Sequence, residues 1–334
     1  MQFFQLANVA WKVLEYKILK KRTPISVSYI STYRCNQKCA YCDWTKVSSE
    51  EMDTENALKF ISDMKESGVI KIGFAGGESL TRPDIEQLIR HAHKCGLIIS
   101  VSSNGRLIEK YLDVIKECVS VVQISLDGTE EIHDLQRGNG SYKCVIDSIE
   151  LLHKHNVKMI TNTVLTKNNK EEIDFVLKIA EKYNHQALIQ PVFTYGLSEC
   201  EEKINDTRLG TDEMQEVIEY LKKCKRKHRP LANSTSFLNY IKKSWNNQKI
   251  INCSANKLFC TVDPKGNILP CCFCDSELCD TYNVSKLGFK KAYEVSKDNN
   301  FSDNCNGCYC NAYMEMNLAF AFNISACLNA MNIV

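Results

Sequence analysis

The chain has 334 residues, 44% of them hydrophobic, which is enough to bury one large core or two smaller ones. Its 42 Lys and Arg and 40 Asp and Glu give a net charge of +2, with both signs interspersed. This balance excludes the broad basic surface expected of a nucleic-acid-binding protein. No apolar run approaches the length of about 18 residues that a transmembrane helix needs, so no membrane span is expected.

The first 24 residues predict an amphipathic helix. Within residues 2–22, apolar side chains share one helical face, polar side chains lie opposite, and basic residues follow. Two interpretations are open: a helix packed on its own protein, or an interfacial helix that rests peripherally on anionic lipid. The apolar face consists of Phe3, Leu6, Ala7, Ala10, Val13 and Leu14, and the basic residues are Lys17, Lys20, Lys21 and Arg22.

Between residues 25 and 196, strand and helix patterns alternate six times. This order predicts an α/β fold with parallel strands and right-handed crossovers. Six units are too few for a closed eight-fold barrel, so we predict a partial, TIM-like (β/α)6 barrel with its chemistry at the carboxyl ends of the strands. The predicted strands are 25–30, 70–74, 98–102, 121–125, 158–165 and 187–191, and the predicted helices are 53–67, 82–95, 107–117, 141–155 and 170–183.

Three cysteines, Cys35, Cys39 and Cys42, follow the first predicted strand directly. Their spacing brings three thiolates to one side of a short loop. Three thiolates suit three corners of a 4Fe–4S cluster and leave one iron without a protein ligand. A structural zinc site is the alternative, but zinc takes four protein ligands in paired spacings and no fourth ligand follows nearby. The loop therefore favours an iron–sulfur cluster.

The remaining cysteines also cluster. The chain has 18 in total, and nine of them lie between Cys253 and Cys310. Secreted disulfide scaffolds are usually much shorter than this chain, and no secretory leader is visible. We therefore expect a cytoplasmic protein in which thiols are kept reduced for metal binding, with peripheral attachment to a membrane by the first helix as the alternative left open above.

Further motifs follow the cysteine loop at the ends of the predicted strands. They are Gly76-Gly77-Glu78, Ser103-Asn104-Gly105, and Ser125-Leu126-Asp127-Gly128 with His133-Asp134 and Arg137-Gly138. Together with the CxxxCxxC run of Cys35, Cys39 and Cys42, they resemble the motifs of the radical S-adenosylmethionine (SAM) superfamily, including its GGE and TNG-type segments, over residues 25–191. The resemblance implies an enzyme that cleaves SAM reductively at a 4Fe–4S cluster to a 5′-deoxyadenosyl radical, which abstracts a hydrogen from the substrate.

The resemblance also implies roles for residues at the strand ends. Glu78 would receive the amino group of SAM, beside glycines that permit close backbone approach. Arg137, whose fork can bind a carboxylate bidentately, would take the methionine carboxylate, and Ser125 the ribose. No residue is assigned as a substrate base or nucleophile. The expected SAM-binding residues are Tyr41, Gly76, Gly77, Glu78, Ser103, Asn104, Ser125, Arg137, Asn162 and Leu165.

Residues 197–250 are polar and predict a helical bridging segment, with helices at 211–227 and 235–245. Residues 251–334 predict a small cysteine-rich domain with a β-hairpin of strands 258–262 and 268–269 and a C-terminal helix at 311–329. This domain resembles the twitch form of the SPASM extension. The resemblance implies one auxiliary 4Fe–4S cluster.

The C-terminal region offers more cysteines than one auxiliary cluster needs. We expect Cys253, Cys271, Cys305 and Cys308 to bind it. Five neighbouring cysteines leave the fourth ligand open, and both a second auxiliary cluster and a zinc ribbon remain alternatives. The five are Cys260, Cys272, Cys274, Cys279 and Cys310.

The sequence does not identify the substrate or the net reaction, which is an oxidation, an epimerisation or a carbon-skeleton change. We expect a small molecule, such as a sugar, an alcohol, or a cofactor or lipid precursor, and a ferredoxin- or flavodoxin-type electron donor. One alternative is a maturase that modifies a peptide or protein. Against it, residues 1–24 are far fewer than the precursor-recognition domain of many such maturases. The other alternative is a non-catalytic iron–sulfur sensor.

Overall fold

A computed structural model describes residues 3–42, 44–47, 50–192, 207–245, 253–271, 282–296 and 308–333. Its strands are β1 (Ser26–Thr32), β2 (Lys71–Gly76), β3 (Ile98–Ser103), β4 (Val121–Ser125), β5 (Met159–Leu165), β6 (Gln186–Pro191), β7 (Phe259–Val262), β8 (Asn267–Leu269) and β9 (Tyr282–Asn283). Its helices are α1 (Phe3–Leu19), α2 (Thr54–Glu66), α3 (Ile85–Lys94), α4 (Leu112–Cys118), α5 (Glu130–Arg137), α6 (Ser141–Lys154), α7 (Ile173–Lys182), α9 (Thr211–Arg226), α10 (Thr235–Ser244), α11 (Val284–Leu287), α12 (Phe289–Val295), α14 (Asn311–Phe320) and α15 (Ile324–Ile333), with short 3-10 turns at Trp44–Lys46, Ser79–Thr81 and Lys170–Glu172.

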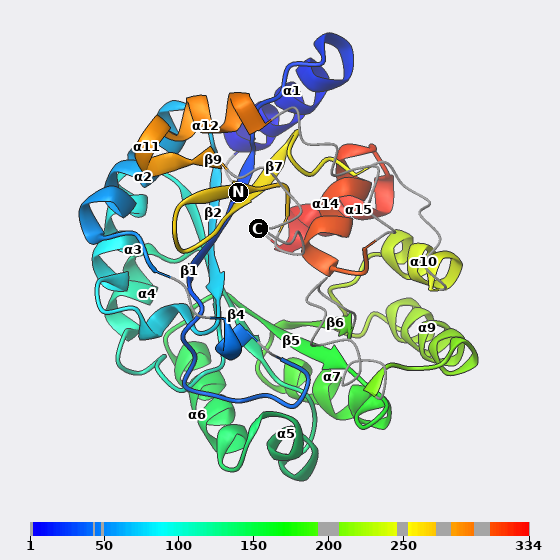
Figure 1. Cartoon of the computed structure of the whole chain (residues 1–334). Coiled ribbons are helices and arrows are strands. Elements are labelled where there is room, and N and C mark those ends of the chain that lie inside the picture. The colour runs from blue at the N-terminus through cyan, green and yellow to red at the C-terminus, as the bar shows by residue number, and fades with distance from the viewer. Residues whose placement is uncertain are drawn as a thin grey trace.

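The described strands form one sheet in the order β6-β5-β4-β3-β2-β1-β7-β8-β9. Strands β1 to β6 are parallel to their neighbours, and α2 to α7 lie along their outer side (Figure 1). The predicted partial barrel of six parallel strands is confirmed. The predicted C-terminal hairpin is also present, and it extends the barrel's own sheet because β7 pairs with β1 in parallel.

The barrel is apolar toward its helices and polar toward its interior. Val27 and Tyr29 of β1 are fully buried and belong to the same core cluster as Phe60 of α2. Side chains alternate along a strand, so the residue between them, Ser28, points to the opposite face. There it is in register with Gly73, which is in turn in register with Ser100. Small and polar residues therefore occupy this interior row of the sheet.

Several predicted helix boundaries were wrong. Helix α3 begins at Ile85 and α4 at Leu112, because turns occupy the preceding residues. Helix α5 was not predicted at all. The C-terminal helix, predicted as one, is two helices, because the chain breaks at Phe322, which adopts a left-handed φ of 59°.

The predicted division of the chain into domains at residues 24, 196 and 250 stays a prediction. One sheet contains strands from both sides of the boundaries at 196 and 250. Within the described part of the chain, no helix combines the length and hydrophobicity needed to cross a membrane.

Candidate functional site

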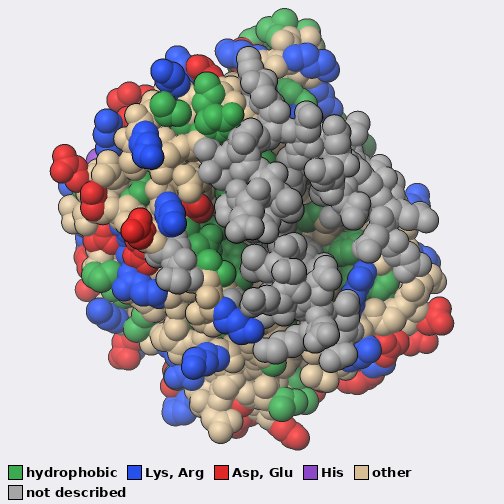
Figure 2. All heavy atoms as spheres, in the orientation of Figure 1, with side chains coloured by type: hydrophobic (Ala, Val, Ile, Leu, Met, Phe, Trp, Pro, Cys, Tyr) green, Lys and Arg blue, Asp and Glu red, His purple; other side chains and the backbone are tan. Residues whose placement is uncertain are grey.

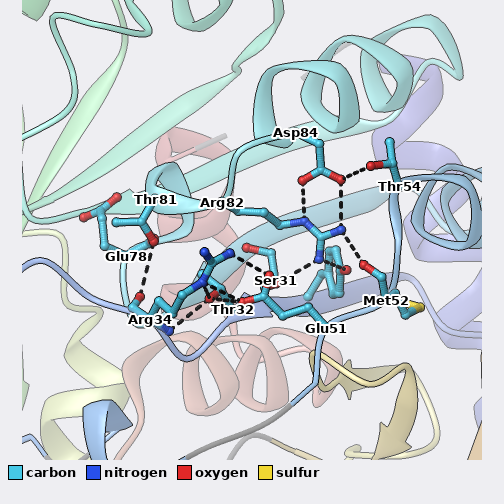
Figure 3. A network of polar contacts seen from close by, with 11 residues as sticks. Ser31, Thr32, Arg34, Glu51, Met52, Thr54, Glu78, Thr81, Arg82 and Asp84 are labelled. Atoms are coloured by element: carbon cyan, nitrogen blue, oxygen red, sulfur yellow. Dashed lines mark hydrogen bonds and ion pairs between the residues drawn. The ribbon is translucent and has the colours of Figure 1, made fainter.

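Arg82 fixes the end of β1, from which the cysteine loop departs. The residue is 2% exposed. Its Nη1 donates to the carbonyl oxygen of Ser31 at 3.1 Å and its Nη2 to that of Met52 at 2.7 Å. Its Nε lies 2.6 Å from Oδ1 of Asp84, and Figure 3 shows the guanidinium between that carboxylate and β1. Through these bonds the buried Arg82 holds the end of β1 to the segments that contain Met52 and Asp84.

A second arginine, Arg34, immediately precedes Cys35. It binds Glu51 with two hydrogen bonds, Nε to Oε1 at 3.0 Å and Nη2 to Oε2 at 2.7 Å. Thr32, the last residue of β1, donates to the same Glu51 (Figure 3). The cysteine loop therefore begins from an anchored position at the carboxyl end of β1.

Gly76 and Gly77 pack directly against this anchored segment. A Cβ on Gly77 would lie 2.6 Å from the carbonyl oxygen of Tyr33 and closer still to that of Arg34. Gly76 has a φ of +127°, which L side chains rarely adopt. The backbones of both segments are also bonded, from Gly77 N to Thr32 O at 2.9 Å. The two glycines are thus explained by contact with the start of the cysteine loop, in addition to any contact with a ligand.

Glu78 is 0% exposed and links the ends of β2 and β3. Its Oε2 accepts the backbone N–H of Asn104 at 2.7 Å and the hydroxyl of Ser103 at 3.2 Å, and its Oε1 accepts the N–H of Leu80 at 3.3 Å. All three donors are neutral, so burial dominates and raises the pKa of Glu78 to about 7. The Asn104 side chain also donates to Cys35 Sγ at 3.8 Å, which ties Glu78 to the cysteine loop.

Asp127 connects four segments at the carboxyl ends of the strands, which we call the barrel mouth: its own segment after β4, the cysteine loop, α5 and β5. Its Oδ2 accepts from Nε of Arg137 at 2.6 Å and from the hydroxyl of Tyr41 at 2.8 Å. Its Oδ1 accepts the N–H of Val164 at 2.9 Å, and its own N–H donates to Nδ1 of His133 at 3.1 Å. Arg137 also lies over the Tyr41 ring, 5.6 Å from the centroid. From the sequence, Arg137 was expected to bind the carboxylate of a ligand, and its pairing with Asp127 was not predicted.

The other predicted residues have different surroundings. Ser125 and Asn162 are in register on β4 and β5. Within the described residues, Asn162 Oδ1 and Gln136 Nε2 are each buried without a hydrogen-bond partner. Leu165 is 1% exposed and packs in the main core, which gives its side chain a packing role. Gln136 was not predicted, and only its position beside Arg137 in the motif pointed to it.

The structure brings Cys35, Cys39 and Cys42 near one another. Burial raises the pKa of each thiol, that of Cys42 to about 11, and the neighbouring cysteine thiols add to the rise for Cys35 and Cys42. No three His, Cys, Asp or Glu side chains in the described residues converge closely enough for a single metal ion. Thiolates that bind a 4Fe–4S cluster each take a different iron, so they need no such convergence.

In the C-terminal region, Cys253, Cys271 and Cys310 pack in one apolar cluster. Cys310 is also hydrogen-bonded to Cys308, with its N–H 3.3 Å from Cys308 Sγ. Cys260 belongs to the opposite cluster, because it lies on the other face of β7 from Phe259. The predicted ligand Cys305 and the alternatives Cys272, Cys274 and Cys279 lie outside the described residues.

The family model of the Radical SAM superfamily matches residues 29–180, from within β1 to within α7. This segment contains all the site residues described above except the C-terminal cysteines. The matched residues 29–180 belong to the radical SAM superfamily. Of related sequences, the AdoMet-dependent heme synthase of Methanosarcina barkeri is 30% identical over 172 residues, covering 49% of this chain and 49% of that protein. The mycofactocin maturase MftC of Mycobacterium ulcerans is 27% identical over 259 residues, covering 75% of this chain and 69% of MftC. The chain therefore matches only about half of the heme synthase.

Solved structures share this fold. Streptococcus suis SuiB bound to its precursor peptide SuiA has a TM-score of 0.67 and 16% identity, covering 91% of this chain and 71% of SuiB. anSMEcpe with AdoMet and the Cp18Cys peptide has a TM-score of 0.62 and 18% identity, covering 93% of this chain and 100% of that one. At these identities the likeness establishes the fold, including the strands and helices beyond the sixth strand.

Proposed function

We propose that this protein is a radical SAM enzyme whose first cluster is bound by Cys35, Cys39 and Cys42. The observation that carries the proposal is the Asn104 bridge, which joins the cysteine loop to the buried Glu78 at one edge of the sheet. When bound, a 4Fe–4S cluster and SAM supply the reductive cleavage that produces a 5′-deoxyadenosyl radical. The protein's own residues bind, orient and shield these groups.

The residues present fit a SAM molecule at this edge. Among the described residues, the hydrogen-bond partners of Glu78 are neutral, so a ligand ammonium would favour its charged form and lower its raised pKa. The buried Asn162 Oδ1 and Gln136 Nε2 offer an acceptor and a donor that the described residues do not satisfy. Arg137, held beside Cys39 by Asp127, would face the carboxylate end of the ligand.

An auxiliary 4Fe–4S cluster belongs to the same proposal. Cys253, Cys271 and Cys308 supply three of its ligands. The fourth is Cys305, as the sequence suggests, or Cys310, which lies with the other three. Cys260 is set aside, because it alternates with Phe259 along β7 and so lies on the face of that strand opposite the cluster that holds Cys253 and Cys271.

A peptide is the substrate class that the relatives favour. MftC is a maturase by name, and SuiB and anSMEcpe have been solved with peptides bound. These comparisons support the maturase alternative better than the small-molecule substrate expected first. A small molecule stays the second candidate, because the 30% identical relative is a heme synthase. A ferredoxin- or flavodoxin-type protein would supply the electron.

Formation of 5′-deoxyadenosine tests the chemistry. Anaerobically purified protein, reconstituted with iron and sulfide, would be given SAM and a reductant, and the nucleoside measured by chromatography. We expect product from the wild type and from Cys95→Ala, which changes a thiol on the far side of the barrel, and none from Cys39→Ala. Intact clusters with no product in the wild type would favour the non-catalytic sensor.

The substrate class needs a separate readout. Candidate peptides and metabolites, each deuterated at carbon, would be incubated with the active protein and SAM. Transfer of deuterium into 5′-deoxyadenosine identifies the substrate that gives up the hydrogen. Transfer from a peptide supports a maturase, and transfer only from a small molecule contradicts it.

A further inference from the structure

Helix α1 has two apolar faces. On one, Val9, Val13 and Tyr16 pack in the cluster that contains Ile25 at the start of β1, and Val13 is 2% exposed. On the other, Trp11, Leu14 and Ile18 recur at helical spacing and are 61%, 40% and 67% exposed. A helix that only packs on its own protein presents polar residues outward. The outward apolar face of α1 therefore needs another explanation.

The exposed apolar surface continues onto the C-terminal helices. Phe322, Ile324 and Leu328 are 52%, 77% and 57% exposed, and the last two lie one turn apart on α15. Lys17 joins the two parts, since its Nζ lies 4.1 Å from the centroid of the Phe322 ring. Apolar surface gathered in this way marks an interaction site. The α1–α15 patch, as we call it, consists of Trp11, Leu14, Ile18, Phe322, Ile324 and Leu328.

The charge around the α1–α15 patch selects its partner. Lys17, Lys20 and Lys21 are exposed at the end of α1. The acid nearest to them, Glu15, is already paired with Lys21 at 3.2 Å. The one acid in α14 and α15, Glu315, accepts the backbone N–H of Ser234. At the top of Figure 2, where Figure 1 places α1, apolar and basic side chains lie together.

We propose that the α1–α15 patch binds the surface of an anionic lipid bilayer. Exposed Trp, Leu and Ile side chains enter the headgroup boundary, and the lysines bind the anionic headgroups. A second copy of the chain fits this surface less well, because a two-fold contact would bring the lysines of both copies together.

The patch lies far from the proposed SAM site. Val13 shares its cluster with Ile25, Ile70 and Ile98, which stand at or just before the starts of β1, β2 and β3. The cysteine loop follows the opposite, carboxyl end of β1. The inner face of α1 thus packs at the amino end of the sheet, opposite the cysteine loop, so the proposed lipid binding concerns anchoring and not delivery of a lipid-linked substrate.

Co-sedimentation with vesicles tests this proposal. The full chain would be mixed with vesicles of phosphatidylcholine alone or with added phosphatidylglycerol. We expect binding to the anionic vesicles only, weakened by salt because the lysines contribute. The double variant Trp11→Ser, Ile18→Ser should bind at least about tenfold more weakly, since two apolar anchors are lost. Leu135→Ser is the matched control, because Leu135 is 65% exposed on α5, outside the patch.

Three outcomes would overturn the proposal: no binding to anionic vesicles at physiological salt, equal weakening by Leu135→Ser, or unchanged binding of the double variant. Analytical ultracentrifugation without lipid covers the alternative occupant. A dimer that disappears in the double variant would show that a second copy covers the patch. Circular dichroism spectra that match the wild type would establish that the exposed substitutions leave the fold intact.

Discussion

Arg137 and Asp127 form a buried ion pair, in which Nε lies 2.6 Å from Oδ2 and the two side chains are 7% and 0% exposed. The pair joins α5 to the end of β4, and Tyr41 adds the cysteine loop to it. Removing one partner of such a pair leaves the other charge buried without compensation. The cost of that change is far larger than the net contribution of the intact pair.

We therefore expect Asp127→Asn to lower the free energy of unfolding by about 3–5 kcal/mol. The measurement is urea unfolding of the cluster-free protein. The control is Asp113→Asn, which removes an ion pair with Lys116. The Asp113 side chain is 82% exposed, so this change should alter the free energy of unfolding by less than about 0.5 kcal/mol. Similar losses in both variants would show that the buried pair has no special role.

Glu78 gives a pH dependence of known sign. Its pKa rises from 4.5 to about 7 on folding because the carboxyl is buried, so the folded protein binds more protons in this range. The contribution of protonated Glu78 to the free energy of unfolding is fully present below pH 4.5 and is lost as pH rises through 7, a change of roughly 3 kcal/mol. Burial lowers the pKa of His133 and His185 to about 4, which acts in the opposite direction.

Glu78→Gln separates these contributions. The variant keeps the histidines but cannot ionise at position 78, so its stability relative to the wild type should increase between pH 5 and pH 8. Urea unfolding at several pH values across this range measures the difference. A constant difference would mean that Glu78 titrates normally in the folded protein.

The close contact of Gly77 with Tyr33 and Arg34 predicts that Gly77→Ala disturbs the cysteine loop. The added methyl group meets backbone carbonyls, which cannot move without the loop, so a loss of about 1–3 kcal/mol is expected together with reduced iron uptake. Gly210→Ala is the control, since its nearest neighbour is the end of the Glu213 side chain at 3.5 Å. Iron retained by both variants after reconstitution would contradict the prediction.

Iron content tests the auxiliary cluster. Two 4Fe–4S clusters hold about eight irons, and loss of one leaves about four. We expect Cys271→Ala to lower the iron content from about eight to about four per chain, whereas Cys260→Ala keeps about eight, because Cys260 lies on the face of β7 opposite the cluster that holds Cys253 and Cys271. About four irons in the wild type would show that the C-terminal cysteines bind no second cluster.

The six parallel strands were predictable because short segments rich in apolar residues alternate with helical patterns and are followed by turn residues, such as Gly76 after Phe74 and Asp127 after Ile124. Helix α5 was missed for a physical reason. Its buried residues are His133, Gln136 and Arg137, so no apolar stripe marks it. The available signal was the pair of acids that opens the helix and Gly138, which ends it with a φ of +102°.

The site could be predicted only as far as its motifs. The sequence places Glu78 and Asn104 at two strand ends, but only the fold shows that Asn104 also contacts Cys35. Likewise the polar pattern around Asp127 does not reveal that it binds Arg137, Tyr41 and Val164 at once. Such contacts depend on how neighbouring strands are aligned, which no local pattern records.

The parallel pairing of β1 with β7 has a consequence for biosynthesis. Ser26 lies opposite Phe259, so the first strand to leave the ribosome waits for a partner made more than two hundred residues later. Until then the nascent barrel has an open edge at β1, a place where chains can pair wrongly. A chain released before residue 259 would keep all six barrel strands and the cysteine loop, yet it would be exposed to aggregation along the very strand that carries this loop.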